Sequence, residues 1–404
     1  MTDTAEPVFF NPLEPGYIED PWPHLAEIRT GDPVHHLLTG QWGLFRYDDV
    51  FKVLRDPDLS VDDANADLEA LDRGQLLDEL EDLEPSRSIL GIDPPDHTRL
   101  RRLVSKAFTP RTIQALRPRI QEMVDTMLDQ MEADGHADVV DRLAFPLPFD
   151  VIAEMLGMPE SDKESIKIWS GDLVKTLDPV LTEAEILAAR DSSLKMNALI
   201  DDVIEWKTAN PADDLLTAMI DAEDGGDKMS KKELRDQVEL LFVAGHETTV
   251  NLIGTGIYEL LRHPHQMAIL RDEEFPPTAV DELLRWVSPV QISRRVTTSE
   301  IEMRGRTIPK GAFLLTSLAS ANHDPDFWGE NAGRLDLHRA DAGKHVSFGS
   351  GVHYCLGASL AKLEAEVAIG SFARRFGQVD IVGQPAWNGR INLRGLESLV
   401  VDLT

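Results

Sequence analysis

The chain is short of cysteine and has a single one, Cys355, among its 404 residues. One thiol excludes an internal disulfide, and it also excludes zinc sites built on paired cysteines. No apolar run reaches the roughly 18 residues of a membrane-spanning helix, and the N-terminal residues lack the basic and apolar segments of a secretory signal. We therefore expect a cytoplasmic protein without a membrane anchor.

Basic residues are also few: 40 Lys and Arg stand against 71 Asp and Glu, which gives a net charge of −31. A protein that binds nucleic acid usually carries a basic surface, so this balance disfavours a nucleic-acid partner. The composition, 42% hydrophobic and 27% charged, is typical of a globular protein. The sequence has no flexible linker and no solenoid repeat, and we expect one domain spanning residues 1–404.

Hydrophobic periodicity predicts a mainly α-helical chain with a minor β part, an α+β protein. The longest predicted helix follows a capping box of Ser230 and Glu233 and ends at Pro264. Its middle is apolar on nearly every side, which indicates burial. Residues 61–84 hold ten acids and one base, which fits a solvated loop or a mobile cover over a pocket. Alternating segments predict short strands in three regions, roughly 30–60, 290–320 and 380–404.

Cys355 lies in the stretch FGSGVHYCLG, where three glycines allow the backbone to turn tightly. A helical pattern starts directly after it, and backbone N–H groups at a helix N-terminus stabilise a thiolate. Such a thiol could be a small buried residue, a nucleophile or a metal ligand. A haem iron needs only one protein ligand on its proximal side, and a thiolate there favours O–O cleavage. We therefore hypothesise that Cys355 ligates a haem iron.

The same stretch resembles the haem-binding loop of the cytochrome P-450 family, Phe-Gly-x-Gly-x-x-x-Cys-x-Gly, at Phe348, Gly349, Gly351, Cys355 and Gly357. The resemblance extends in the same order over essentially the whole chain. It implies a single-domain P-450 fold in which haem b lies between the long central helix and the cysteine loop with its following helix. It also implies a haem-thiolate monooxygenase that activates O2 with two electrons and two protons.

The sequence AGHETT lies in the long buried helix. A buried charge is costly unless it has a partner or a function, so Glu247 is either satisfied by a neighbour or chemically active. A zinc-binding HExxH motif is excluded because its last position is Val250. The resemblance implies that Glu247 and Thr248 are the family's acid–alcohol pair, which relays protons through water. It also implies a groove for oxygen at Ala244, Gly245 and Thr248.

The sequence ELLR places Glu282 and Arg285 three residues apart on one helical face, a spacing that usually indicates a surface ion pair. In the family this ExxR motif is a buried network completed by a later arginine, and Arg334 stands where the resemblance places that arginine. Leu335 replaces the Phe that the family often has next. Haem propionates need cationic or hydrogen-bonding partners, and four positions match the family's usual ones: His97, Arg101, Arg295 and His353.

The resemblance implies that electrons come from NAD(P)H through separate proteins, a ferredoxin and a ferredoxin reductase, which approach on the cysteine side. A basic patch on an acidic protein would steer an acidic partner. Scattered surface bases without a docking role are the alternative interpretation. The candidate patch consists of Arg102, Lys106, Lys344 and Lys362.

The resemblance further implies a substrate pocket above the haem, with walls from residues 61–90, 169–179, 186–196, 240–249 and 290–293. An apolar pocket with few polar anchors suits a hydrophobic substrate, such as a steroid, fatty acid, terpenoid or macrolide, which we expect to be hydroxylated or epoxidised. A peroxide-driven peroxygenase and a non-catalytic haem sensor are alternative functions. The predicted lining consists of Leu240, Val243, Ala244, Gly245, Thr248, Val290, Gln291 and Ile292.

Overall fold

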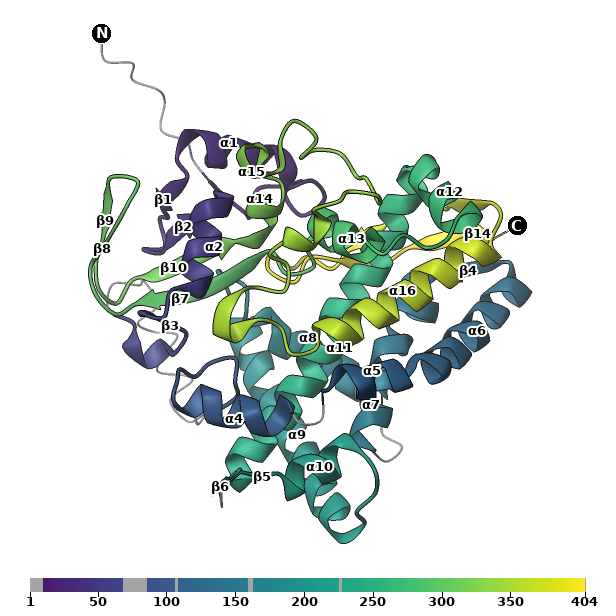
Figure 1. Ribbon diagram of the computed structural model, residues 1–404, viewed down its shortest axis with the longest axis horizontal. Coiled ribbons are helices and arrows are strands. Elements are labelled where there is room, and N and C mark those ends of the chain that lie inside the picture. The colour runs from purple at the N-terminus through teal and green to yellow at the C-terminus, as the bar shows by residue number, and fades with distance from the viewer. Residues whose placement is uncertain (1–9, 68–85, 106–107, 159–162, 225–226, 404) are drawn as a thin grey trace.

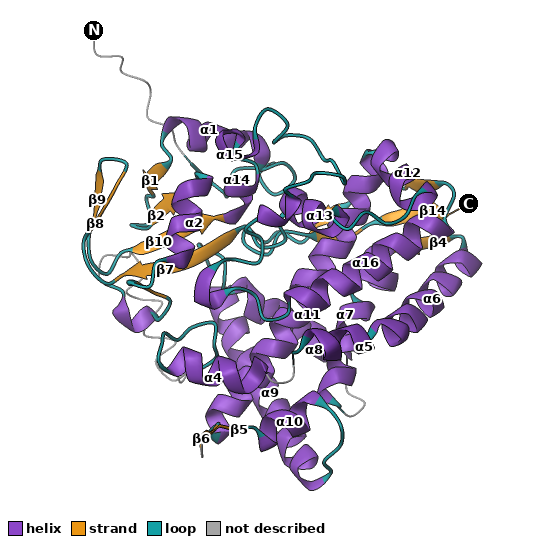
Figure 2. Cartoon of the chain, in the orientation of Figure 1, coloured by secondary structure: helices purple, strands orange, loops and turns teal. Residues whose placement is uncertain are grey.

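The computed structural model describes residues 10–67, 86–105, 108–158, 163–224 and 227–403. Most helices gather on one side of the molecule, and the largest sheet lies on the other (Figures 1 and 2). Within the described ranges, no helix has both the length and the hydrophobicity to cross a membrane. The α-helices are α1 Trp22–Gly31, α2 Tyr47–Arg55, α4 Asp96–Ser105, α5 Pro110–Ala115, α6 Arg117–Asp134, α7 Pro146–Leu156, α8 Lys163–Lys175, α9 Glu183–Ala209, α10 Leu215–Asp221, α11 Lys231–Arg262, α12 Pro264–Asp272, α13 Ala279–Val287, α14 Leu318–Asn322, α15 Pro325–Trp328 and α16 Ala358–Arg375.

The largest sheet has the strand order β1-β2-β10-β7-β3, and only the β2–β10 pair is parallel. Its strands are β1 Val34–His36, β2 Trp42–Leu44, β3 Leu59–Ser60, β7 Ile292–Thr297 and β10 Phe313–Ser317. The smaller sheets are formed by β4 His136–Asp138 with β11 Val379–Ile381 and β14 Val400–Leu403, by β12 Ala386–Trp387 with β13 Leu396–Ser398, by β5 Glu223–Asp224 with β6 Asp227–Lys228, and by β8 Ile301–Met303 with β9 Arg306–Ile308. Strands therefore occur in all three regions expected from the sequence. In addition, β4 and β5–β6 lie in the part that was expected to be helical.

The predicted long helix is α11, and its capping box has the expected hydrogen bonds. The Ser230 N–H donates to Glu233 Oε2 at 2.8 Å, and the Glu233 N–H donates to Ser230 Oγ at 3.2 Å. α11 packs against α7, α9, α13 and α16. It approaches α16 closely because Gly256 has no side chain: a Cβ there would lie 3.2 Å from Ile369 Cδ1. Since α16 begins just after Cys355, the packing of α16 on α11 also fixes the position of the cysteine loop relative to the long helix.

The ExxR motif forms a fully buried network on α13. The Arg285 guanidinium donates to both oxygens of Glu282, at 2.7 and 2.8 Å, and both side chains have no exposed surface. Arg285 also donates to the main-chain oxygens of Asn322 and Ala332. Because every donor of a buried guanidinium needs an acceptor, this network fixes the loop after α15 against α13.

The third arginine of this network is Arg339, so the assignment of Arg334 to that position is wrong. Arg339 Nε donates to Glu282 Oε2 at 3.0 Å. The Arg334 side chain is exposed, and only its main-chain oxygen takes part, accepting from Arg285 and Arg339 at 3.0 Å each. Leu335, which stands in place of the family's Phe, is buried. The path of the loop, which the sequence motif does not specify, decides which arginine turns inward.

Replacing Arg339 by Leu should lower the free energy of unfolding by about 3 kcal/mol, since Glu282 would lose one buried charged partner. Replacing the exposed Arg334 by Ala should change it by less than about 0.5 kcal/mol. Urea unfolding followed by circular dichroism measures both variants. Equal effects of the two substitutions would contradict the assignment of Arg339.

Candidate active site

Cys355 is held at the start of α16 with its sulfur facing the helix N-terminus. Its N–H donates to Phe348 O at 2.9 Å, which closes the loop. Burial raises the pKa of the Cys355 thiol, while N–H groups of Gly357 and Ala358 and the charge of Arg101 act to lower it. These are the donors that a sulfur anion at a helix N-terminus would use.

The loop before Cys355 requires glycine at position 351. Gly351 has a φ of +72°, and a Cβ there would lie 2.8 Å from the main-chain oxygen of Leu54. A side chain would therefore be excluded both by the left-handed backbone and by α2. Gly349 also has a positive φ, +68°. The glycines of the motif thus serve the path of the loop that presents the sulfur.

α11 has an open side at the level of the acid–alcohol sequence. Ala244 is exposed although Phe242 and His246, on either side of it, are buried. The Thr248 hydroxyl also lies on an exposed face and donates to the Ala244 main-chain oxygen at 3.0 Å. Ala244 has a small side chain, and the accessible hydroxyl of Thr248 lies one turn later. Together they leave room for a flat ligand against this face of α11.

Gly245 does not belong to this open side. A Cβ at Gly245 would contact Ile152 of α7 at 3.4 Å, so the residue faces a helix rather than a groove. The absence of a side chain therefore serves the packing of α11 on α7, and the assignment of Gly245 to the pocket lining stays a prediction. The one-residue step from Ala244 to Gly245 turns the side-chain direction by about 100°, which explains the difference.

His97, Arg101, Arg295 and His353 come together from three distant segments. The rings of His97 and His353 lie 4.2 Å apart, and Arg101 contributes to the electrostatics of His97. Burial, followed by the charges of His97 and Arg295, lowers the pKa of His353 to about 4. Arg101 donates to the main-chain oxygen of Tyr354, next to Cys355.

Asp93 supplies negative charge that acts on His97, Arg295 and His353, but its hydrogen bonds come from Ser60 and the Val61 N–H. Both ring nitrogens of His97 are buried without a hydrogen-bond partner. Arg295 is 5% exposed, and within the described part of the chain its guanidinium donates to the neutral oxygens of Ser293, Arg294 and Leu54. Because buried polar groups are normally paired, the His97 ring and the Arg295 guanidinium, with Arg101 and His353 beside them, fit an anionic ligand, and the two propionates of a haem have that chemistry.

Glu247 is a buried carboxylate with a charged partner. Arg390, in the connection between β12 and β13, donates through Nη1 to Glu247 Oε2 at 2.7 Å. Ser170 of α8 donates to the other oxygen at 3.4 Å, and His246 Nε2 lies 3.6 Å from it. Burial acts to raise the pKa of Glu247, but the contact with His246 and the Arg390 charge outweigh it and lower the pKa to about 2. Glu247 is therefore ionised at neutral pH.

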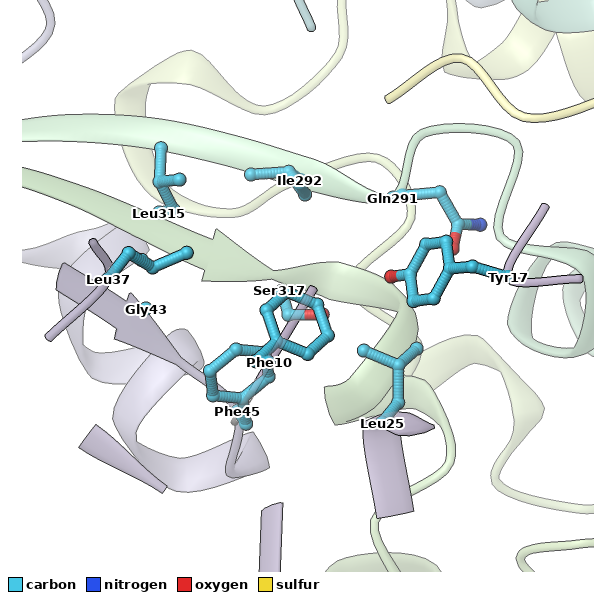
Figure 3. Close-up of a pocket in the computed structure, with 10 residues that line it drawn as sticks. All are labelled: Phe10, Tyr17, Leu25, Leu37, Gly43, Phe45, Gln291, Ile292, Leu315 and Ser317. Atoms are coloured by element: carbon cyan, nitrogen blue, oxygen red, sulfur yellow. The ribbon is translucent and has the colours of Figure 1, made fainter. Parts of the chain in front are cut away.

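The predicted lining residues after α13 do not all point the same way. Gln291 donates through Nε2 to the main-chain oxygens of Val287 and Ser288, and its side chain lies beside Tyr17 and Leu25 in a small cavity (Figure 3). Ile292 lines the same cavity. Gln291 is thus directed at the N-terminal segment, which contradicts its assignment to the lining of the pocket above the haem.

The other predicted walls are partly outside the described residues. Residues 68–85 of the acidic segment lie outside the described residues. Lys106 of the predicted basic patch also lies outside them. Leu240 packs with Ile89 and Leu100, and Val243 packs with the cluster that joins α7, α9 and α11. Val290 packs against the cluster under the largest sheet.

Comparisons with known proteins agree with this geometry. A family model described as Cytochrome P450 matches residues 183–383. The polyketide biosynthesis cytochrome P450 PksS of Bacillus subtilis is 36% identical over 99% of this chain and 100% of its own length. The chain belongs to the cytochrome P450 family. The monooxygenase PikC of Streptomyces venezuelae is 36% identical to this P450 over 99% of the chain and 95% of PikC.

Solved structures support the same assignment. The structure of PksS covers 98% of this P450 with a TM-score of 0.87. P450BioI, solved in complex with an acyl carrier protein bearing hexadec-9Z-enoic acid, covers 96% with 31% identity and a TM-score of 0.86. The mainly α P450 fold is therefore confirmed. As a P450 monooxygenase, the protein uses haem b and takes electrons from NAD(P)H through partner proteins.

Sequence reasoning missed Arg390, Ser170 and Arg339. A buried glutamate requires a nearby cation, which was a signal that some arginine must reach Glu247. The signal does not say which one, since Arg390 lies 143 residues away in the chain.

Cys355→Ser should abolish the strongly red-shifted Soret band of the reduced carbon monoxide complex, because a hydroxyl does not supply the thiolate that produces it. The absorption spectrum of the purified holoprotein measures this. Ser350→Ala, in the same loop, is the matched control and should keep the band. A red-shifted band in Cys355→Ser would contradict thiolate ligation.

Proposed function

We propose that this P450 hydroxylates or epoxidises a hydrophobic small molecule, with Cys355 as the axial ligand of the haem iron. The observation that carries this proposal is the sulfur at the N-terminus of α16, with the N–H groups of Gly357 and Ala358 directed at it. The haem, when bound, supplies the oxygen-activating chemistry of the family. The residues proposed to hold it are Cys355, Phe348, Gly349, Gly357, Ala244, His97, Arg101, Arg295 and His353.

Thr248, on the open side of α11, and the buried Glu247 next to it are proposed to handle protons. The Thr248 hydroxyl is accessible and keeps its own proton in a hydrogen bond to the Ala244 main-chain oxygen, so its lone pairs can accept from a water molecule. Glu247 is an ionised carboxylate one residue away. The pair favours the monooxygenase over a peroxide-driven peroxygenase, which needs no proton supply of this kind, and over a haem sensor.

Thr248→Ala should lower product formation about 100-fold, the scale of a lost proton-transfer group, and should divert reducing equivalents to hydrogen peroxide. Thr249→Ala is the matched control, because Thr249 is also hydrogen-bonded to the oxygen four residues earlier but is buried. The ratio of peroxide to product per NAD(P)H consumed measures both variants. Unchanged coupling in Thr248→Ala would remove this residue from proton delivery.

The substrate is proposed to be an acyl chain or a polyketide-type molecule, within the broader group of hydrophobic compounds expected from the sequence. The polyketide role named for PksS and the fatty acyl carrier protein bound to P450BioI support this choice. The half-buried apolar side chains of Leu240 and Val243 on α11 suit such a molecule.

A screen for spin-state shifts of the ferric haem tests the substrate proposal. Fatty acyl chains and macrolides, free and carrier-bound, should shift the Soret band to shorter wavelength by displacing a distal water, whereas steroids and terpenoids should bind more weakly. A shift produced only by steroids or terpenoids would contradict it.

A ferredoxin is proposed to dock on the cysteine side, next to the exposed Arg102. The described bases of the expected patch are partly neutralised: Lys362 pairs with Asp281, and Lys344 lies 4.0 Å from Asp341.

A further inference from the structure

Two adjacent side chains of α11 bind the main chain of the segment that precedes α4. Gln237 is 1% exposed. Its Oε1 accepts the Ile89 N–H at 3.1 Å, and its Nε2 donates to Arg87 O at 3.0 Å. Asp236 Oδ2 accepts the Arg87 N–H at 2.7 Å. Three hydrogen bonds from α11 therefore fix the main chain of residues 87–89.

The other end of this segment is fixed to the largest sheet. Asp93 Oδ1 accepts the Val61 N–H at 2.9 Å, and the other oxygen of Asp93 accepts from the hydroxyl of Ser60 in β3. α4 then begins at Asp96. Residues 87–93 are thus held at both ends, by α11 and by the end of β3, and Ile89 between them has a defined position.

Ile89 contacts the cysteine loop. The ring of His353 is hydrogen-bonded to the Ile89 main chain. The Ile89 side chain is buried and packs in one cluster with Leu240 of α11 and with Leu356, the residue after the cysteine. A single residue therefore lies between the long helix and the loop that carries the sulfur.

The orientation of the His353 ring depends on this contact. The ring lies 4.2 Å from the ring of His97, whose two buried nitrogens have no hydrogen-bond partner in the part of the chain that the structure describes. His353 is in the cysteine loop and His97 is on α4, so neither element alone fixes both rings. Because a hydrogen bond is directional, the bond to Ile89 restricts the His353 ring to one orientation. The position of Ile89 depends in turn on Gln237.

We propose that Gln237 is a positioning residue for the haem propionate site. Its amide holds residues 87–89 on α11, the main chain of Ile89 orients His353, and His353 and His97 together receive a propionate oxygen. The inference deepens the proposed function and rests on it, because His353 belongs to the proposed haem site. Loss of the two Gln237 hydrogen bonds should therefore weaken the retention of haem.

Transfer of haem from the ferric holoprotein to apomyoglobin measures the release rate without any turnover. Gln237→Met has a similar length but no amide, and it should release haem about tenfold faster, the scale of one lost hydrogen bond. Gln237→Asn is a second loss variant, because its amide is one methylene too short to keep both bonds. Gln237→Glu should stay within about twofold of the wild type, since burial favours a neutral carboxyl group, which has the same shape and keeps one acceptor and one donor.

A double-mutant cycle with His353→Ala decides whether Gln237 acts through His353. His353→Ala alone should speed haem release, and Gln237→Met should then add less than about a further twofold. Asn251→Leu is the matched control, because Asn251 is also a buried amide on α11 and donates to Leu393 O at 3.2 Å. Its release rate should be that of the wild type. Amide hydrogen exchange at Ile89 should become about tenfold faster in Gln237→Met.

An unchanged release rate in Gln237→Met and Gln237→Asn would overturn the proposal, even if exchange at Ile89 becomes faster. A tenfold increase that persists in the His353→Ala background, or an equal increase in Asn251→Leu, would overturn it too, because general loosening of α11 would then suffice. Wild-type release in His353→Ala would also contradict it, since the effect could not pass through that ring.

The proposed function fails separately from this inference. A holoprotein that shows the red-shifted carbon monoxide band but forms no product from any compound that shifts its spin state would not be the proposed hydroxylase. Haem release is measured without substrate or reductant, so the cycle of Gln237 and His353 would still decide on the positioning role.

Discussion

A sulfur atom that must lie at the N-terminus of a buried helix is the constraint on which the rest of the structure depends. Cys355 can meet the N–H groups of Gly357 and Ala358 only if α16 begins immediately after it. The loop can deliver the sulfur there only because Gly351 passes within van der Waals distance of α2. α16 then packs on α11 and α6, so the long helix and the cysteine loop have a fixed relation to each other.

Three buried glutamates differ in the partners of their carboxyl groups. The difference distinguishes a structural role from a role in proton transfer. Glu282 is saturated by Arg285 and Arg339, which suits a rigid element. Glu364 on α16 has a side-chain oxygen without a partner, and burial raises its pKa far above the usual value, so it is neutral. Glu247 is ionised by its contact with His246 on the same helix and by the charge of Arg390 from a loop, so its charge depends on two different elements.

The sequence alone predicted those features that the local spacing of residues determines. The capping box at Ser230, the burial of α11 and the helix after Cys355 follow from residue spacing, and the structure has all three. The sequence did not predict side-chain contacts that depend on the path of a loop. Arg339 rather than Arg334 reaches Glu282, because the turn after residue 336 directs it inward. Gln291 turns to the N-terminal segment, since its amide can satisfy the end of α13 there.

Arg390 shows why the remaining part of the site was not visible in the sequence. Near its position the chain reads WNGRINLRG, which by its Asn-Gly pair indicates a turn and nothing more. The contact of Arg390 with Glu247 depends on the position of this turn. Hydrogen bonds of Asn392 fix the turn to Asp178 on one side and to Gln291 and Ile292 on the other. Segments expected to form pocket walls are thus joined by hydrogen bonds between residues 100 or more positions apart, and a local motif cannot encode such contacts. The connection between β12 and β13 supplies both the cation that contacts Glu247 and the main-chain N–H groups that Asp178 accepts, so two contacts to distant segments depend on the conformation of one short turn.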